Sequence, residues 1–540
     1  MATNNTKYHL EIQTHRKNPY GLLRSSYRED GKVLHKNICR FSGLSLEQLY
    51  GMQAALQGRA VMKEDFNITL SREYGASYAL HAIMKEIGLD RDIYSRPSED
   101  WVRASTAMVI GRLVYAGSKL SLSHCGSFSA LWEVCGIEGR VNVNTHCYET
   151  MDRLLERQDA IQKNLAKRHL REGMLVLYDI TSSYFEGEYA DSDIVEFGYN
   201  RDKKRGHEQA VISLLCSKDG CPVAVEVLRG NTKDETTVLG KIAEIKEKYG
   251  IEKVVFVGDR GMVTQFNYAQ INHETIKVIS ALTHGTINKL REEKVIQAGL
   301  FDEKNIVEVI SDGIRYCLCK NPDMAIKEAA TRQALLKKTT EELDKIVAGT
   351  RKTKDSKEIR AGRVVNKFKM GKFIIFNKKD DNDKKDDNLS YTLNEKKIEQ
   401  ESSLDGCYVI YTDVTPEDMT ACEVVASYKS LIKVEQAFTN IKTVRLEVHP
   451  MYHKTDNRIK CHVFICMLAY YVMWHIKQRL QPLFESDGKG AKRKHTFDQV
   501  METLKCIRKD TVEFQRATTN VVTVPTDEQN RILQLLGVNI

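Results

Sequence analysis

Residues 174–181 read MLVLYDIT, a continuous apolar run that reaches an acidic residue, Asp179. Such a run, without the alternation of a half-exposed strand, is typical of a central strand buried on both faces. A second run of this kind, KVVFVGD at 253–259, ends at Asp259, and a third, IKVISAL, covers 276–282. These runs predict the buried middle of a sheet, with carboxylates on two of its strands.

A hairpin and a helix are predicted between the first two runs. Residues 207–217 and 221–228 are strand-like and are joined by a Lys-Asp-Gly turn, in which glycine accepts a positive φ most easily. The helix is predicted to run to Tyr249, capped by Thr232. The resulting order β, β, β, α, β, α, β is that of ribonuclease H-like α/β folds, which is the fold class we predict.

The pattern breaks over about 290–405. Strand-like pieces at 313–319 and 372–376, and the solvated stretch NKKDDNDKKDDN at 377–388, indicate an insertion into the main fold. The core sequence returns with GCYVIYTDV at 406–414, and a long helix is predicted from about Pro416 to Lys442.

The N-terminal region is predicted to be mainly helical. It opens with a hairpin over 20–45, turning at Asp-Gly, and two amphipathic segments follow at 101–116 and 147–169. A role in binding DNA or pairing protomers and a plain scaffold role are both open. The predicted regions are the N-terminal DNA-binding or dimerisation region at 1–170, the core at 171–289 and 406–480, the insertion at 290–405, and a C-terminal region at 481–540.

Composition indicates a globular protein of two to four domains, because 540 residues with 42% apolar and 29% charged side chains can bury several cores. The longest apolar run, 463–474, is shorter than the roughly 20 residues that cross a bilayer and predicts a buried helix. The N-terminus has no apolar signal region, so we expect no membrane insertion and a cytoplasmic location.

The 13 cysteines are dispersed, which is typical of reduced thiols. The spacings closest to metal ligation are Cys317 with Cys319 and Cys461 with His462. Neither has a second pair nearby, so the simpler interpretation is that these are small buried side chains.

Three carboxylates carry the predicted chemistry. A charge within a buried strand is costly without a partner or a metal, which favours a functional role for Asp179. Asp259 ends a similar run, although alone it could cap a helix. Glu435 lies beside the apolar face formed by Val434, Ala437, Phe438 and Ile441, and by helix geometry alone it is an ordinary solvated residue. A functional role for Glu435 is favoured only when it is considered together with the two aspartates of the buried strands.

Three carboxylates without convergent Cys or His ligands suit Mg²⁺, with Mn²⁺ as a substitute. Two such ions roughly 3.5 to 4 Å apart can activate an attacking oxygen and stabilise a leaving oxygen in phosphoryl transfer. The sequence therefore predicts a site for phosphoryl transfer.

These residues resemble bacterial insertion-sequence transposases of the DDE type, in the subgroup with a Y-x2-R-x3-E-x6-K signature. The chain reads Tyr428-x2-Leu431-x3-Glu435-x6-Lys442, so three of four letters match. The likeness also covers YDITSSYFEG, RGNTKDE, VGDRGM and LEVHPMYHKTDNRIKCHVFICMLAYYV, which together span about 175–472.

The resemblance implies that Asp179, Asp259 and Glu435 bind the catalytic metal ions, and that Tyr428 and Lys442 contact DNA. Leu431 stands where the signature has arginine, so Arg445 or Lys433 is expected to supply that cation. The family further implies a β-rich insertion, double-stranded DNA with inverted-repeat ends and target DNA as partners, a homodimer, and a bacterial, nucleoid-associated setting.

Positive charge is concentrated late in the chain. Residues 442–509 contain fourteen Lys or Arg against six Asp or Glu. Lys492, Arg493 and Lys494 are predicted to bind phosphate, and residues 199–204 form a second basic candidate; a solvated loop is the alternative for both.

Two other functions stay open. A nuclease would use the same three acids to hydrolyse DNA without strand transfer, and a DNA-binding relict would need no metal. Divalent-ion-dependent cleavage separates the relict from the enzymes, and a joining assay separates the nuclease from the transposase.

Overall fold

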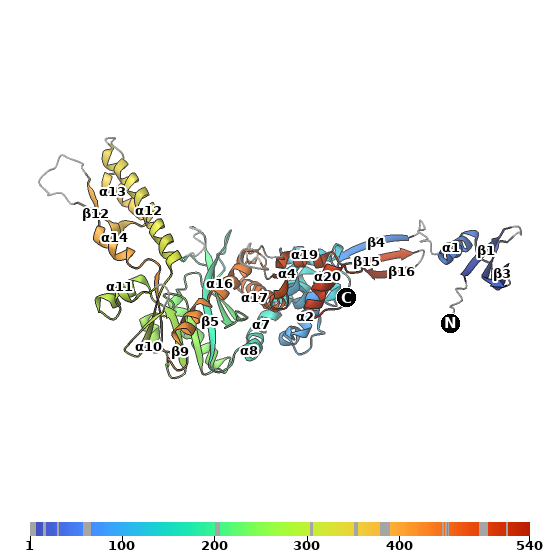
Figure 1. Ribbon diagram of the computed structural model, residues 1–540, viewed down its shortest axis with the longest axis horizontal. Helices are drawn as coiled ribbons and strands as arrows, with labels where there is room; N and C mark the ends of the chain where they lie inside the picture. The colour runs from blue at the N-terminus through green and yellow to red at the C-terminus, as the bar shows by residue number, and fades with distance from the viewer. Residues whose placement is uncertain are drawn as a thin grey trace. The chain divides into compact units, whose positions relative to one another are not determined.

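The computed structural model (Figure 1) describes residues 7–14, 18–29, 32–57, 66–199, 206–302, 306–349, 355–377, 389–444, 446, 448, 451, 453–484, 495–514 and 517–540. The chain divides into two compact units. The first combines Met1–Glu73 with Ile507–Val524, and the second combines Tyr74–Cys506 with Pro525–Ile540. The predicted boundaries near 170, 289, 405 and 480 all fall inside the second unit and stay a prediction.

An eight-stranded mixed sheet forms the core of the second unit, in the order β10-β11-β14-β9-β8-β5-β6-β7. The strands are β5 (Met174–Tyr184), β6 (Gln209–Ser217), β7 (Pro222–Leu228), β8 (Val254–Gly258), β9 (Ile276–Ala281), β10 (Val307–Ser311), β11 (Ile314–Lys320) and β14 (Cys407–Thr412). β5, β8 and β9 are parallel neighbours, while β5, β6 and β7 pair antiparallel. Every residue of β6 and β8 is buried, as their apolar runs predict.

The predicted element order is confirmed by β5, β6, β7, α9 (Asp234–Glu247), β8, α10 (Gln265–Gln270) and β9. The predicted Thr232 cap is wrong, because α9 begins after Lys233. Thr232 instead lies in a turn, where its N–H donates to the carbonyl of Arg229.

The helix predicted from Pro416 to Lys442 is three segments: α15 (Ala421–Lys429), α16 (Ile432–Thr439) and a π-helical stretch, η5 (Asn440–Val444). α15 begins later than predicted because Thr420 and Glu423 form a capping box. The predicted apolar face is confirmed, since Val434, Ala437, Phe438 and Ile441 are all buried.

The insertion predicted to be β-rich is mainly helical over its described residues. It contains α11 (His284–Glu292) at its entry, α12 (Pro322–Ala348), α13 (Lys357–Phe368) and α14 (Glu395–Ser402), with one short pair, β12 (Ile374–Phe376) and β13 (Tyr391–Leu393). The Asn321 side chain caps α12 and Pro322 opens it. Leu343 and Ile346 then pack with Ala361 and Val365 in a small core. The strand-like piece at 313–319 joins the main sheet as β11.

The predicted helices of the N-terminal region are present from Gly75 onward. They are α2 (Gly75–Glu86), α3 (Leu89–Ile93), α4 (Asp100–Val114), α5 (Lys119–Ser123), α6 (Leu131–Val134), a π-helical turn (Asn144–Glu149), α7 (Thr150–Glu156) and α8 (Gln158–His169). α17 (Asp456–Arg479) packs against α4, α7 and β7. Helices α18 (Gln481–Phe484), α19 (Phe497–Lys505) and α20 (Asp527–Leu536) complete this unit.

The predicted buried helix at 463–474 is confirmed as part of α17. This helix is long and apolar enough to cross a membrane, but 83% of its most apolar window is buried within the fold. A core helix meets the same criteria of length and composition, so the absence of a membrane contact stays a prediction.

The first unit contains two small sheets. β1 (Lys7–Gln13), β2 (Tyr20–Glu29) and β3 (Lys32–Ser42) form an antiparallel sheet against which α1 (Leu46–Leu56) packs, and β2 with β3 is the predicted hairpin. β4 (Phe66–Glu73) pairs with β15 (Arg508–Phe514), which also pairs with β16 (Ala517–Val522). Strands from opposite ends of the chain therefore share a sheet.

Candidate active site between β5 and the end of β8

The first two predicted acids are neighbours on adjacent parallel strands. Tyr178 of β5 is in register with Gly258, the last residue of β8. Asp179 and Asp259 each follow by one residue, on chains that lie about 4.8 Å apart in such a pair. Asp179 is half-buried and Asp259 is exposed. The sheet thus brings together two carboxylates that are 80 positions apart in the chain.

A tight turn holds Asp259 at the surface. The N–H of Met262 donates to the carbonyl of Asp259 at 3.1 Å, and Gly261 has φ of 84°, as position three of a type II turn requires. The buried hydroxyl of Ser280 donates to the same carbonyl at 3.2 Å. Asp259 is not a helix cap, because Thr264 caps α10.

Tyr428 connects α15 to this turn. Its hydroxyl donates to Asp259 Oδ1 at 3.1 Å. Burial, and then the negative charge of Asp259, raise the pKa of the Tyr428 hydroxyl, so it stays a protonated donor at neutral pH. The resemblance implied a DNA contact for Tyr428; here the hydroxyl orients a predicted metal ligand, and the DNA contact stays a prediction.

Lys442 of η5 makes a comparable contact with β5. Its side chain is buried, and Nζ donates to Thr181 Oγ1 at 3.1 Å. Thr181 is two residues beyond Asp179, so both side chains lie on one face of the strand. Lys442 is therefore held on the face of the sheet that carries Asp179, and its predicted DNA contact is untested.

Glu435 lies midway between Tyr428 and Lys442 in the sequence. It is exposed on α16, a helix that packs against β5 through its buried apolar face. The segments on either side of α16 are therefore held by hydrogen bonds: Tyr428 of α15 donates to the Asp259 carboxylate, and Lys442 of η5 donates to Thr181 beside Asp179.

The three carboxylates are not gathered as closely as ligands of a single ion. Among the described residues, the triplet of His, Cys, Asp or Glu side chains with all ligand atoms within 4.8 Å of one another is His169, Cys221 and His475. At least two of the three acids are therefore further apart than that. A site for two ions about 4 Å apart, unlike a site for one ion, does not require all three to lie that close.

The cation that replaces the missing arginine has three candidates. Leu431, at the arginine position of the signature, is an uncharged, buried side chain. Lys433 Nζ donates to the carbonyl of Lys218 at 2.8 Å, so Lys433 is already engaged. Arg445 lies outside the described residues, as do Lys492, Arg493 and Lys494. Arg260 was not predicted: it is exposed, follows Asp259 directly and lies close enough to lower the pKa of Tyr428 against the larger effect of burial.

Two comparisons with known proteins found a match. The family profile described as transposase DDE domain matches residues 175–472, which contain all three acids. A cryo-EM structure of the piggyBac transposase synaptic complex with hairpin DNA is similar at 8% identity, over 79% of this chain and 78% of that chain, with a TM-score of 0.35. No curated protein sequence matches the chain.

Proposed function

Since the chain belongs to the transposase DDE-domain family, we propose that it binds the inverted-repeat ends of a DNA element and catalyses metal-dependent strand cleavage and strand transfer. The observation that carries the proposal is the β5–β8 register, which places Asp179 and Asp259 on neighbouring chains, while α16, which bears Glu435, packs against β5. Together with the family, this arrangement supports phosphoryl transfer at the end of β8.

The donor set fits Mg²⁺ or Mn²⁺. All three side chains supply oxygen ligands, which these ions prefer, and two of the three are exposed to solvent. Bound ions would activate the attacking oxygen and stabilise the leaving oxygen. The residues proposed to hold them are Asp179, Asp259 and Glu435.

The surrounding side chains position these ligands. The Tyr428 hydroxyl donates to one oxygen of Asp259 and leaves the other free to face an ion. Lys442, bonded to Thr181, adds positive charge on the face that carries Asp179. Arg260, exposed beside Asp259, is proposed to supply the phosphate contact that Leu431 lacks.

We also propose that the core is ribonuclease H-like. The support is the chain order β5, β6, β7, α9, β8, α10, β9, with three antiparallel strands followed by two parallel ones. End recognition is assigned to the N-terminal region, and a homodimer is the simplest assembly for cutting two ends together. The basic residues Lys492, Arg493 and Lys494 are proposed to add phosphate contacts.

The test is a paired cleavage and joining assay on DNA taken from the flanks of the gene, with wild-type protein and Asp259→Asn. We expect Mg²⁺-dependent cleavage and joining by the wild type and neither by the variant, which should still bind DNA. Asp191→Asn, at an exposed acid outside β5 and β8, is the control and should behave as wild type. Cleavage without joining would show that the protein is a nuclease and not a transposase. DNA binding that needs no metal, with neither cleavage nor joining, would show that it is not an enzyme.

A further inference from the structure

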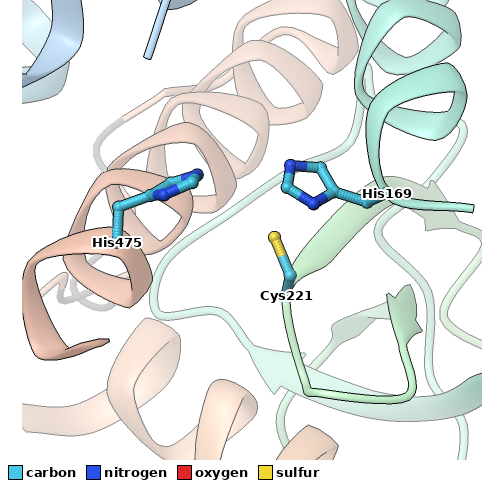
Figure 2. A group of neighbouring side chains, drawn as sticks. All are labelled: His169, Cys221 and His475. Carbon is cyan, nitrogen blue, oxygen red and sulfur yellow. The ribbon is translucent and has the colours of Figure 1, made fainter. Parts of the chain in front are cut away.

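A second polar cluster lies apart from the acids, where three elements of the second unit meet. His169 ends α8, Cys221 immediately precedes β7, and His475 is near the end of α17. One ligand atom from each lies within 4.8 Å of the other two. Figure 2 shows ring nitrogens of both histidines and the Cys221 sulfur directed into the same space.

We propose that His169, Cys221 and His475 bind one Zn²⁺ ion that joins α8, the β6–β7 turn and α17. One sulfur and two imidazole nitrogens are the ligand types that Zn²⁺ takes, whereas Mg²⁺ and Mn²⁺ prefer oxygen. Three protein ligands leave one tetrahedral position, which water fills.

The strongest observation is an orphaned nitrogen. Nε2 of His475 is buried and has no hydrogen-bond partner. A buried polar atom is normally satisfied, and each exception needs an explanation. Coordination of an ion by Nε2 satisfies it without any further side chain.

The second ring nitrogen of His169 is held as zinc ligands usually are. Its Nε2 lies 2.9 Å from the hydroxyl oxygen of Tyr471, which also accepts from Arg168 Nη1 at 3.0 Å. Nδ1 is therefore the nitrogen left for the cluster. When Nδ1 holds the ion, Nε2–H donates to Tyr471, and such outer partners fix the ring of a ligating histidine.

The two arginines near the cluster are paired with carboxylates, which reduces their repulsion of a bound metal ion. Arg168 pairs with Asp92 at 2.8 Å, and Arg479 pairs with Glu86 at 2.8 Å. Burial, the larger cause, lowers the pKa of His169 and of His475 to about 4, so both rings are neutral at physiological pH. Burial raises the pKa of the Cys221 thiol, so the thiol carries its proton before an ion binds. It releases that proton to solvent when the sulfur binds Zn²⁺.

The primary test uses wild-type, full-length protein loaded with Zn²⁺ and freed of excess metal. We expect one Zn²⁺ per chain, and X-ray absorption should find one sulfur at about 2.3 Å and nitrogen or oxygen at about 2.0 to 2.1 Å. Zinc bound with no sulfur, with several sulfurs, or not at all would overturn the proposal.

Variants then locate the site. Co²⁺ should replace Zn²⁺ and give a thiolate-to-metal absorption band in wild type but not in Cys221→Ala, while Cys135→Ala, at another buried cysteine, keeps the band. His475→Gln should weaken the binding and His81→Gln should not. Asp259→Asn should keep the full zinc content, which separates this site from the acids. An unchanged Co²⁺ band in Cys221→Ala would contradict the assignment.

Discussion

The acid site and the Cys-His cluster lie in the same unit but differ in chemistry and exposure. Asp179 lies in the middle of β5, beside the end of the parallel strand β8, and Asp259 directly follows β8 and is open to solvent. Cys221, by contrast, is fully buried beside two neutral histidines. Under the two proposals, the same unit keeps an accessible oxygen site for exchangeable Mg²⁺ apart from an enclosed sulfur and nitrogen site that retains Zn²⁺.

The largest expected effect follows from removing a carboxylate. Asp259→Asn should lower the cleavage rate by roughly a thousandfold or more, because ions at such a site contribute several kcal/mol to the transition state. Single-turnover cleavage in Mg²⁺ measures this. The zinc content should not change; a parallel loss of zinc would show that the two sites are not independent.

Cys221→Ala should produce the opposite pattern. Zinc affinity should fall by more than the roughly 10- to 100-fold typical of losing an outer partner, since a direct ligand is removed. Competition with a chelator measures the affinity. Mg²⁺-dependent cleavage at a temperature where the variant is folded should stay close to that of Cys135→Ala; cleavage lost only in Cys221→Ala would make the cluster part of the reaction.

Tyr428→Phe removes one hydroxyl from the acid site and keeps the aromatic ring. Because that hydroxyl orients Asp259, cleavage should fall by roughly 10- to 100-fold. A matched control is Tyr249→Phe, which removes a hydroxyl bonded to Glu244 on α9 and should leave cleavage unchanged. Equal cleavage rates for the two variants would show that the Tyr428 hydroxyl does not contribute to the acid site.

The smallest expected effect concerns DNA binding. Arg260→Ala should reduce the salt slope of DNA binding by about one unit, as expected when one phosphate contact is lost. Leu431→Ala removes a buried apolar side chain, so it should lower stability and leave the slope unchanged. Affinity titrations across salt concentrations measure both, and an unchanged slope in Arg260→Ala would refute its phosphate contact.

The sequence predicted the sheet well because each buried strand can be recognised from a short run of neighbouring residues. The runs ending at Asp179 and Asp259 are continuous and apolar, and the strands they predict are β5 and β8. The packing face of α16 followed from helical spacing. The type II turn at Asp259 and the exposed position of Arg260 were not predicted, although Gly261 suits the positive φ that such a turn requires.

The remaining features depend on contacts that spacing does not encode. His169, Cys221 and His475 come from three elements, and the cysteine spacings that invited a metal interpretation, Cys317 with Cys319 and Cys461 with His462, are not the group that the structure brings together. The insertion was expected to be β-rich because the family resemblance implied it, and the helix start at Asn321 and Pro322 was not recognised. The pairing of β4 with β15 joins residues over 400 positions apart.

The most direct test of the central claim is anomalous diffraction from crystals of the wild-type protein soaked in Mn²⁺. We expect anomalous peaks within about 2.0 to 2.6 Å of carboxylate oxygens from Asp179 and Asp259, with Glu435 completing the ligand set. Strong Mn²⁺ peaks elsewhere, with none beside Asp179 and Asp259, would contradict it.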